Sequence, residues 1–357
     1  MSLAELTLEN LRCIEKAELS LGPGTTLIFG ANGAGKTSIL EAAYLLGRGR
    51  SFRTRLNERL IRHGQAFVRV VGRVNADPAD RKLGVEVQRA KEGKGGTTGR
   101  LDGSDVRSFA DLATAFPVQA MDPDAHKLIE DSSTRRRRWL DWAVFHVEHG
   151  FAGSWARYQR ALAQRNAALR VGRTEVDVWD HELAREGEAM ALARQRVLTA
   201  LHPYWMEIAA ELTDLPITLD LQPGWDQSLG LGEALAAVAQ RDRDRRTTTV
   251  GPHRADLSLK VRGKLAREVL SRGQQKLAAV ALNLCQLEYL KREHGLRPTL
   301  LLDDPSAELD RERLSRFIGR VTGLECQVIV AALDRDTPLF GAPETVFHVE
   351  QGRVFQV

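Results

Sequence analysis

One octapeptide constrains the fold of this chain more than any other feature. It reads Gly30-Ala31-Asn32-Gly33-Ala34-Gly35-Lys36-Thr37 and fits the phosphate-binding loop pattern G-x-x-x-x-G-K-[ST] without a mismatch. Residues 26–29 before it have the composition of a buried strand, and residues 38–46 after it carry the apolar stripe of a helix. A strand, a glycine-rich turn and a helix in that order predict a site for a nucleoside triphosphate. The plainer alternative is an ordinary glycine-rich turn.

Each part of the loop has a chemical role. Glycines allow successive backbone N–H groups to point at phosphate oxygens. The N-terminus of the following helix, where Ser38 lies, adds partial positive charge. Lys36 is expected to reach the β- and γ-phosphates, and Thr37 to offer its hydroxyl to Mg²⁺. Residues 30–38 are therefore the predicted nucleotide contacts, with ATP and Mg²⁺ as cofactors.

The composition argues against several other classes of protein. The 357 residues suggest about two domains, and 43% of them are apolar, which is enough for substantial cores. No apolar stretch approaches the ~18 residues of a membrane span, and the N-terminus does not resemble a secretory signal. Cys13, Cys285 and Cys326 are too widely spaced to form a C-x-x-C pair. We expect a cytoplasmic protein without a membrane partner.

Arginines gather in three short runs, although the formal net charge is only +4. Residues 48–62 hold six arginines, residues 135–138 are four in succession, and residues 241–246 hold four arginines and two aspartates. Because the guanidinium fork suits phosphate oxygens, each run is either a contact to DNA or a solvated face with internal ion pairs. The candidate DNA contacts from the first two runs are Arg48, Arg50, Arg53, Arg55, Arg137 and Arg138.

Alternating apolar and polar residues predict an antiparallel β-layer around the loop. Residues 1–30 read as a β-hairpin leading into the loop strand, with a turn at residues 22–24. Residues 66–90 contain two more alternating runs, and residues 93–99 are expected to form a polar, glycine-rich hairpin tip.

Helical spacing replaces the strand pattern between residues 125 and 245. One apolar stripe comprises Trp155, Tyr158, Leu162 and Leu169, and a second comprises Trp179, Leu183, Met190, Ala193, Val197, Leu201, Trp205 and Ile208. Pro203 is expected to kink or restart the second helix. The two stripes predict a short antiparallel helical hairpin with the tryptophans in its core.

The strand pattern returns from residue 247. Strands are predicted at residues 248–250, 256–261, 299–302 and 327–332, and helices at residues 273–291 and 311–321. We therefore expect an α/β ATPase domain, with a mixed sheet and an antiparallel β-layer, formed by residues 1–124 and 247–357. Residues 125–246 are predicted to be a helical arm inserted into that domain.

Two carboxylates follow the apolar strand at residues 299–302. A buried parallel strand delivers side chains at its carboxyl end, where nucleotide sites lie in such sheets. Asp303 is predicted to hold Mg²⁺ opposite Thr37, and Asp304 to orient or deprotonate the attacking water, with Lys36 as the other catalytic residue. Alternatively, the pair merely caps the following helix.

A second motif, Leu270-Ser271-Arg272-Gly273-Gln274-Gln275-Lys276, resembles the L-S-G-G-Q signature of ABC-type ATPases. The resemblance implies an ABC-type ATPase head in which Ser271, Arg272, Gly273 and Gln274 meet the γ-phosphate held by another subunit. Two ATP molecules are then enclosed in a head-to-tail homodimer. Downstream, Ser306 and Asp310 lie in a segment that resembles the D-loop along that interface. A plain helix start capped by serine is the alternative.

Within that superfamily the chain resembles the RecF family over about residues 3–335. The segments that carry the resemblance are Leu8–Arg12, Gly33–Ala42 with Gly49–Arg53, Arg137–Asp141, Gln164–Leu169, Gly251–Leu257, Ser271–Lys276, and Asp303-Asp304 with Glu308–Asp310. The family pattern implies that Arg12 approaches bound nucleotide. Arg272, which stands in place of one glycine of the signature, is also a trait of that family.

Several positions depart from the wider ABC pattern. Asp304 stands where transporter ATPases carry glutamate, and residues 328–333 contain no histidine to sense the γ-phosphate. Both departures imply slow hydrolysis, which suits a switch. Gln119 is the candidate for the Q-loop, or else a surface glutamine. His253 and Arg254 either touch DNA or orient their own strand.

The resemblance implies an ATP-dependent DNA-binding protein of replication and repair. It would act on double-stranded and gapped DNA at single-strand gaps and junctions as a weak, DNA-stimulated ATPase. With RecR and RecO it would help load RecA onto strands coated with single-strand-binding protein. The alternatives are the ATPase subunit of an ABC-type transporter and a structural head like those of SMC proteins. The long segment between loop and signature argues against the first, and the short arm against the second.

Overall fold

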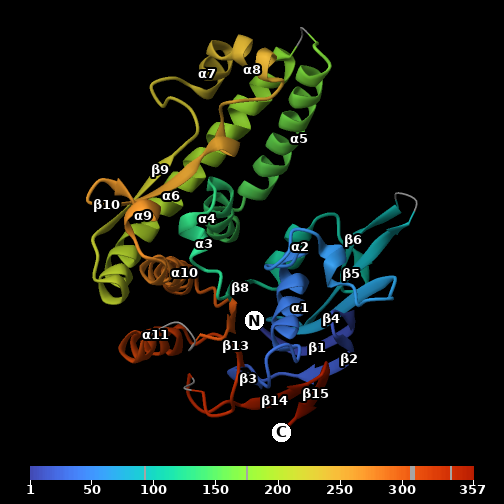
Figure 1. Ribbon diagram of the computed structural model, residues 1–357. Helices are drawn as coiled ribbons and strands as arrows, with labels where there is room; N and C mark the ends of the chain where they lie inside the picture. The colour runs from blue at the N-terminus through green and yellow to red at the C-terminus, as the bar shows by residue number, and fades with distance from the viewer. Residues whose placement is uncertain (92–93, 174–175, 306–309, 338–339) are drawn as a thin grey trace. The chain divides into compact units, whose positions relative to one another are not determined.

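A computed structural model describes residues 1–91, 94–173, 176–305, 310–337 and 340–357 (Figure 1), without the side chains of residues 90–94. The chain separates into two units. One comprises Met1–Ala125 with Lys291–Val357, and the other comprises His126–Leu290. The second unit begins one residue after the start of the predicted arm, residues 125–246, and extends to Leu290.

The first unit contains the predicted antiparallel β-layer. Its strand order is β2-β1-β4-β5-β6-β7, where the strands are β1 (Ser2–Leu11), β2 (Ile14–Ser20), β4 (Phe67–Asn75), β5 (Arg81–Lys91), β6 (Lys94–Leu101) and β7 (Ser104–Asp105). Alternate residues of β1 and β4 are buried, which is why these strands could be found from the sequence. The hairpin-tip prediction for residues 93–99 is wrong for the described part, because residues 94–101 form β6, paired with β5.

A second, mostly parallel sheet carries the phosphate-binding loop. Its order is β15-β14-β3-β13-β12-β8, with strands β3 (Thr25–Phe29), β8 (Val118–Met121), β12 (Thr299–Asp303), β13 (Val328–Ala332), β14 (Thr345–Glu350) and β15 (Arg353–Gln356). Strand β13 pairs in parallel with both β3 and β12, with Ala332 opposite Phe29 and Ala331 opposite Asp303. The carboxyl ends of β3 and β12 therefore meet at one edge of the sheet. No strand was predicted over β14 or β15.

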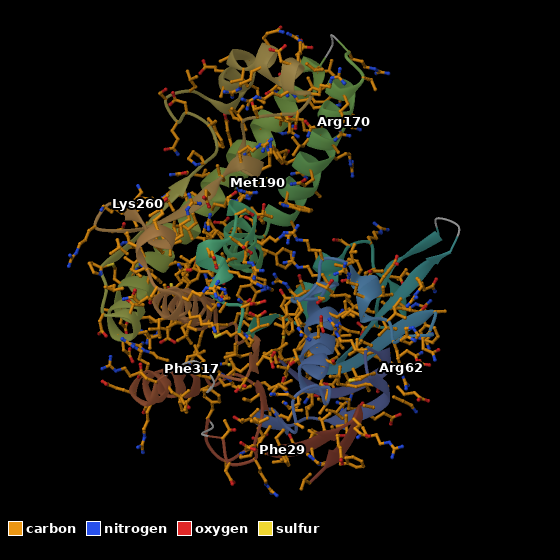
Figure 2. The ribbon with its side chains drawn as sticks, in the orientation of Figure 1. Phe29, Arg62, Arg170, Met190, Lys260 and Phe317 are labelled. Carbon is orange, nitrogen blue, oxygen red and sulfur yellow. The ribbon has the colours of Figure 1, made fainter. Side chains whose placement is uncertain are left out.

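Helix α1 (Lys36–Arg48) packs against strands of both sheets, and Figure 1 shows it beside β4 and β8. Every residue from Ser38 to Gly47 is buried, and one core cluster joins α1 to both sheets. The first unit also contains η1 (Asn57–Leu60), α2 (Phe109–Ala115) and α11 (Arg311–Leu324). Phe317 of α11, labelled in Figure 2, packs edge-on against Phe340.

The second unit is built around two long helices, α5 (Phe151–Arg170) and α6 (Asp180–Thr213). Arg165 contacts Asp180 and Arg157 contacts Glu186, so the helices run antiparallel as predicted. The short elements of the unit are α3 (Lys127–Glu130), α4 (Ser133–Val147), η2 (Asp177–Trp179), α7 (Leu231–Ala237), α8 (Ala239–Arg245), η3 (Pro252–Arg254) and α9 (Ala266–Val269). Helix α10 (Arg272–His294) leads from this unit into the first.

Two details of the helical prediction need correction. Trp155 is 45% exposed and lies outside the core, whereas Trp205 is fully buried and donates from its indole N–H to the Ile217 carbonyl. Helix α6 runs through Pro203 without restarting. Proline lacks only one N–H, and packing along both flanks of a long helix maintains it.

A small sheet extends the second unit beyond residue 246. Strand β9 (Ile217–Gln222), which the sequence did not reveal, pairs with β10 (Asp256–Val261), and β10 pairs with β11 (Lys264–Leu265). This pairing is why residues 256–265 cluster with the helices. The strand predicted at 248–250 is wrong, because these residues form an irregular segment. Among the described residues no helix is long and apolar enough to cross a bilayer.

Candidate nucleotide-binding site

The phosphate-binding loop turns sharply between β3 and α1. Gly30, Gly33 and Gly35 all have positive φ angles. A Cβ atom on Gly30 would lie 2.2 Å from the Val349 carbonyl oxygen, so β14 leaves no room for a side chain there. The backbone thus presents Ala31, Asn32 and Ala34 in a compact loop that ends at the N-terminus of α1.

Lys36 closes the loop from inside. Its Nζ atom lies 2.6 Å from the Gly30 carbonyl oxygen and 3.0 Å from that of Ala31. Partial burial lowers the pKa of the Lys36 ammonium, and the nearby carboxylates of Asp303, Asp304 and Asp334 oppose that shift. A partly desolvated ammonium held by backbone carbonyls is ready to exchange them for phosphate oxygens, because hydrogen bonds between ionised partners are stronger.

Thr37 and Asp303 meet as expected. The Thr37 hydroxyl donates to Asp303 Oδ1 over 2.9 Å, joining the first turn of α1 to the end of β12. Burial raises the pKa of the Asp303 carboxyl, while the hydrogen bond from Thr37 and the charge of Arg53 lower it. A hydroxyl and a partly desolvated carboxylate beside a phosphate loop form a suitable donor set for Mg²⁺. Asp304 follows with φ 49° and donates its N–H to the Ala331 carbonyl.

Arg12 lies in the β1–β2 turn and is held by a carboxylate that sequence reasoning missed. Its Nε and Nη2 atoms donate to the two oxygens of Glu41 over 2.6 and 2.8 Å. Glu41 is fully buried in α1 and also accepts a short hydrogen bond from the Ser51 hydroxyl. An acidic residue inside the otherwise apolar stripe of α1 was the signal for this contact.

The other predicted residues of the first unit lie as follows. Gln119 is half-buried in the middle of β8, opposite Leu300 of β12. Asp310 caps α11 by accepting the Arg313 N–H over 2.9 Å, and that hydrogen bond lowers the pKa of its carboxyl. Ser306 lies outside the described residues.

The signature motif caps a long helix in the second unit. The Ser271 hydroxyl accepts the Gln274 N–H over 3.3 Å, and the Gln274 side chain accepts the Ser271 N–H over 2.9 Å. This reciprocal capping box fixes the start of α10. Ser271, Arg272 and Gly273 are exposed, whereas Gln275 is buried and donates to the Leu270 carbonyl. The motif thus presents a serine, a glycine and a helix N-terminus on the surface.

The candidate DNA contacts of the first unit differ in exposure. Arg48 is half-buried at the end of α1, with its guanidinium 5.6 Å from the centre of the Tyr44 ring. Arg50 is also half-buried, whereas Arg53 and Arg55 are exposed.

The candidate contacts of the second unit are mostly engaged within it. Arg137 donates to the Ser133 hydroxyl and the Ala255 carbonyl, while Arg138 is exposed. His253 bonds the Tyr158 hydroxyl over 2.7 Å and the Thr248 carbonyl over 3.1 Å, and burial lowers the pKa of its imidazole to about 4. Both contacts of this half-buried imidazole are made within the second unit. Arg254 is exposed and donates to the same Thr248 carbonyl.

Comparison with known proteins agrees with this geometry. Residues 2–353 match the family described as RecF/RecN/SMC N terminal domain. The chain is 40% identical, over the full length of both, to the DNA replication and repair protein RecF of Stenotrophomonas maltophilia, and 38% identical to that of Pseudomonas entomophila, covering 98% of the latter.

Solved structures give the same result at the level of the fold. The structure of the recombination mediator protein RecF-ATP in the RecFOR pathway superimposes with a TM-score of 0.89 at 26% identity, covering 100% of this chain and 97% of that one. An Smc head bound to the C-terminal winged-helix domain of ScpA matches with a TM-score of 0.56 at 18% identity, covering 100% and 97%. The loop, the Thr37–Asp303 pair and the capped signature thus belong to an ABC-type ATPase fold, and the chain is a member of the RecF family of DNA replication and repair proteins.

Proposed function

We propose that this chain is an ATP-dependent DNA-binding repair protein that uses slow ATP hydrolysis as a conformational switch. The observation that carries the proposal is the arrangement of Lys36 over the loop carbonyl of Gly30 and of Thr37 against Asp303, in the first unit. Lys36 would bind the β- and γ-phosphates, and Thr37 and Asp303 would hold Mg²⁺, which neutralises phosphate charge. Asp304 would orient the attacking water, and its short side chain suits slow turnover.

The second half of the site would come from another copy of the chain. The exposed Ser271 hydroxyl, the backbone of Gly273 and the N-terminus of α10 make a phosphate-binding surface. In the proposed homodimer this surface contacts the γ-phosphate bound by the partner, with Arg272 and Gln274 flanking it. Hydrolysis of that phosphate would remove the contact and open the dimer.

DNA binding is proposed to be independent of sequence and to depend on ATP. Exposed arginines, among them Arg53, Arg55 and Arg138, suit phosphate contacts. We further propose gapped duplexes and single-strand/duplex junctions as substrates. RecR and RecO would be direct partners, and RecA and single-strand-binding protein indirect ones, in a cytoplasmic repair complex.

The first test measures binding of a fluorescently labelled gapped duplex by anisotropy at fixed salt, with and without ATP. We expect ATP to tighten binding by wild type and to have no effect on Lys36→Ala, because that variant lacks the ammonium for the phosphates. Lys16→Ala is the matched control, since Lys16 is exposed on β2 and pairs with Glu18 at the surface. DNA binding that ignores ATP in the wild type would refute the proposal and reopen the transporter alternative, which membrane copurification would then test.

The dimer has a sharper test by complementation. Lys36→Ala and Ser271→Ala should each abolish ATP hydrolysis alone, because every site in either homodimer lacks one half. In a mixture of the two, a head-to-tail dimer has one site with both defects and one site that is intact. Recovery of a fraction of the ATPase activity on mixing supports the dimer. No recovery at any ratio contradicts it and favours an enzyme that acts as a monomer.

A further inference from the structure

A group of exposed arginines lies around the end of α5, and we call it the arm-tip cluster. It comprises Arg170, Arg173, Arg241, Arg243, Arg245 and Arg246, all of which are exposed. Figure 2 labels Arg170 at the end of α5, and Figure 1 shows α8 near this end of the helix. The last four of these arginines belong to the run at residues 241–246. Because that run also holds two aspartates, the sequence did not decide between a DNA contact and a solvated face with internal ion pairs.

A buried network fixes α8 to α5. Arg165 of α5 and Asp242 of α8 have fully buried side chains, and Arg165 Nη1 lies 2.7 Å from Asp242 Oδ2. Beside this pair, Asn166 accepts hydrogen bonds from the N–H and the hydroxyl of Thr248, over 2.7 and 2.9 Å. Arg170 lies five residues after Arg165, about 7.5 Å along the helix. The cluster is therefore held as a surface by a rigid anchor.

The same network decides between the two interpretations of the run. A solvated face with internal ion pairs requires the aspartates to neutralise the neighbouring arginines. Instead, Asp242 is buried against Arg165 and Thr249, and Asp244 accepts from Gln240 over 2.9 Å. Among the described residues, none of the six arginines forms a salt bridge, although Arg241 donates to the Thr249 hydroxyl.

Three surface arginines of the first unit behave differently. On the antiparallel sheet of the first unit, Arg69 pairs with Glu86, Arg81 with Asp102 and Arg100 with Asp105, at distances of 2.7 to 2.9 Å. These arginines already have their counter-ions. Only unneutralised cations gain fully from binding phosphates and releasing the counter-ions condensed on a nucleic acid. The arm-tip cluster is such a surface.

We propose that the arm-tip cluster is a second nucleic-acid contact, which binds the phosphate backbone through Arg170, Arg173, Arg241, Arg243, Arg245 and Arg246. The exposed face of α8 carries Gln240, Asp244 and arginines but no apolar side chain. A protein partner would need an apolar centre for its interface, whereas a phosphate backbone needs only guanidinium forks. Contacts to phosphates carry no sequence specificity. They determine the affinity for nucleic acid and its dependence on salt.

The inference rests on the proposed DNA-binding function and extends it to the second unit. The test variant is Arg243→Ala/Arg245→Ala/Arg246→Ala. The control, Arg69→Ala/Arg81→Ala/Arg100→Ala, removes the same charge from ion-paired positions. Anisotropy with a labelled duplex in ATP is measured over a series of salt concentrations, and binding of a fluorescent ATP analogue is measured in parallel.

We expect the cluster variant to bind duplex about tenfold more weakly at about 0.1 M salt. The plot of log K against log salt should become less steep, by about 0.9 for each DNA phosphate that the variant no longer neutralises. The control should change affinity less than about threefold, and both variants should bind the ATP analogue like wild type. Unchanged duplex affinity of the cluster variant, equal effects in the two variants, or weaker binding with an unchanged salt slope would each overturn the inference; the first would point to an acidic protein as the partner. The wild type with and without ATP tests the proposed function separately, because a cluster effect on the salt slope does not require ATP gating.

Discussion

Replacing Arg165 by methionine should destabilise the second unit more than any surface substitution of an arginine. Arg165 is fully buried, and its Nε and Nη1 atoms lie 2.7 Å from Asp180 and from Asp242. Asp242 is equally buried, so the substitution would leave a carboxylate without a counter-ion in the interior. Removing one partner of a buried ion pair costs about 3–5 kcal/mol.

The melting temperature gives the clearest measure of this loss. In a domain of this size 1 kcal/mol shifts melting by roughly 2–4 °C, so the variant should melt about 6–20 °C below wild type. Arg196→Met is the matched control: Arg196 is about half exposed and pairs with Glu148 over 2.8 Å at the surface. An exposed pair contributes only about 0–1 kcal/mol.

A double variant tests the cause. Arg165→Met/Asp242→Asn removes the buried charge together with its partner, so it should recover part of the loss that Arg165→Met produces alone. Strict additivity of the two changes would refute the argument that an uncompensated charge is responsible. Equal melting temperatures of the Arg165→Met variant and the Arg196→Met control would also refute it.

Three further outcomes are expected. Burial lowers the pKa of His253 to about 4 from an unfolded value near 6.5, so the unfolded chain binds the extra proton between these values. Stability should therefore fall by about 2–3 kcal/mol as pH drops from about 6.5 to about 4, and His253→Gln should flatten that part of a denaturation profile. Gly352→Ala should weaken ATP binding, because Gly352 donates its N–H to the Ala34 carbonyl over 2.9 Å and a Cβ atom there would lie 2.3 Å from the Cys13 carbonyl oxygen. Gly263→Ala is the control, because it has a similar φ and no atom within 4 Å of the new Cβ, and it should bind ATP normally. Equal ATP affinities of the two variants in a titration would contradict the idea that Gly352 supports the phosphate-binding loop. Thr37→Val should weaken Mg²⁺-dependent ATP binding at least about tenfold while leaving the metal-free affinity nearly unchanged, which a titration in EDTA would check.

The sequence alone determined the phosphate-binding loop, the two carboxylates at the end of β12 and the signature. Each is a contiguous motif whose chemistry depends on local backbone geometry, so its residues are neighbours in the chain. The alternation in β1 and β4 and the apolar stripe of α6 were equally local, because one buried face imposes a period on the sequence.

Only the tertiary structure decided which charges are neutralised. Glu41 beside Arg12, and Arg165 between Asp180 and Asp242, join residues 15 to 77 positions apart, and no periodicity marks such contacts. Strand β9 was hidden for the same reason, because a short edge strand is stabilised by its partner β10. The sequence of residues 241–246 is equally compatible with a DNA contact and with a solvated face with internal ion pairs. The burial of Asp242 against α5 leaves its arginines without a salt bridge among the described residues, because the fold directs that carboxylate inward and the guanidinium groups into solvent.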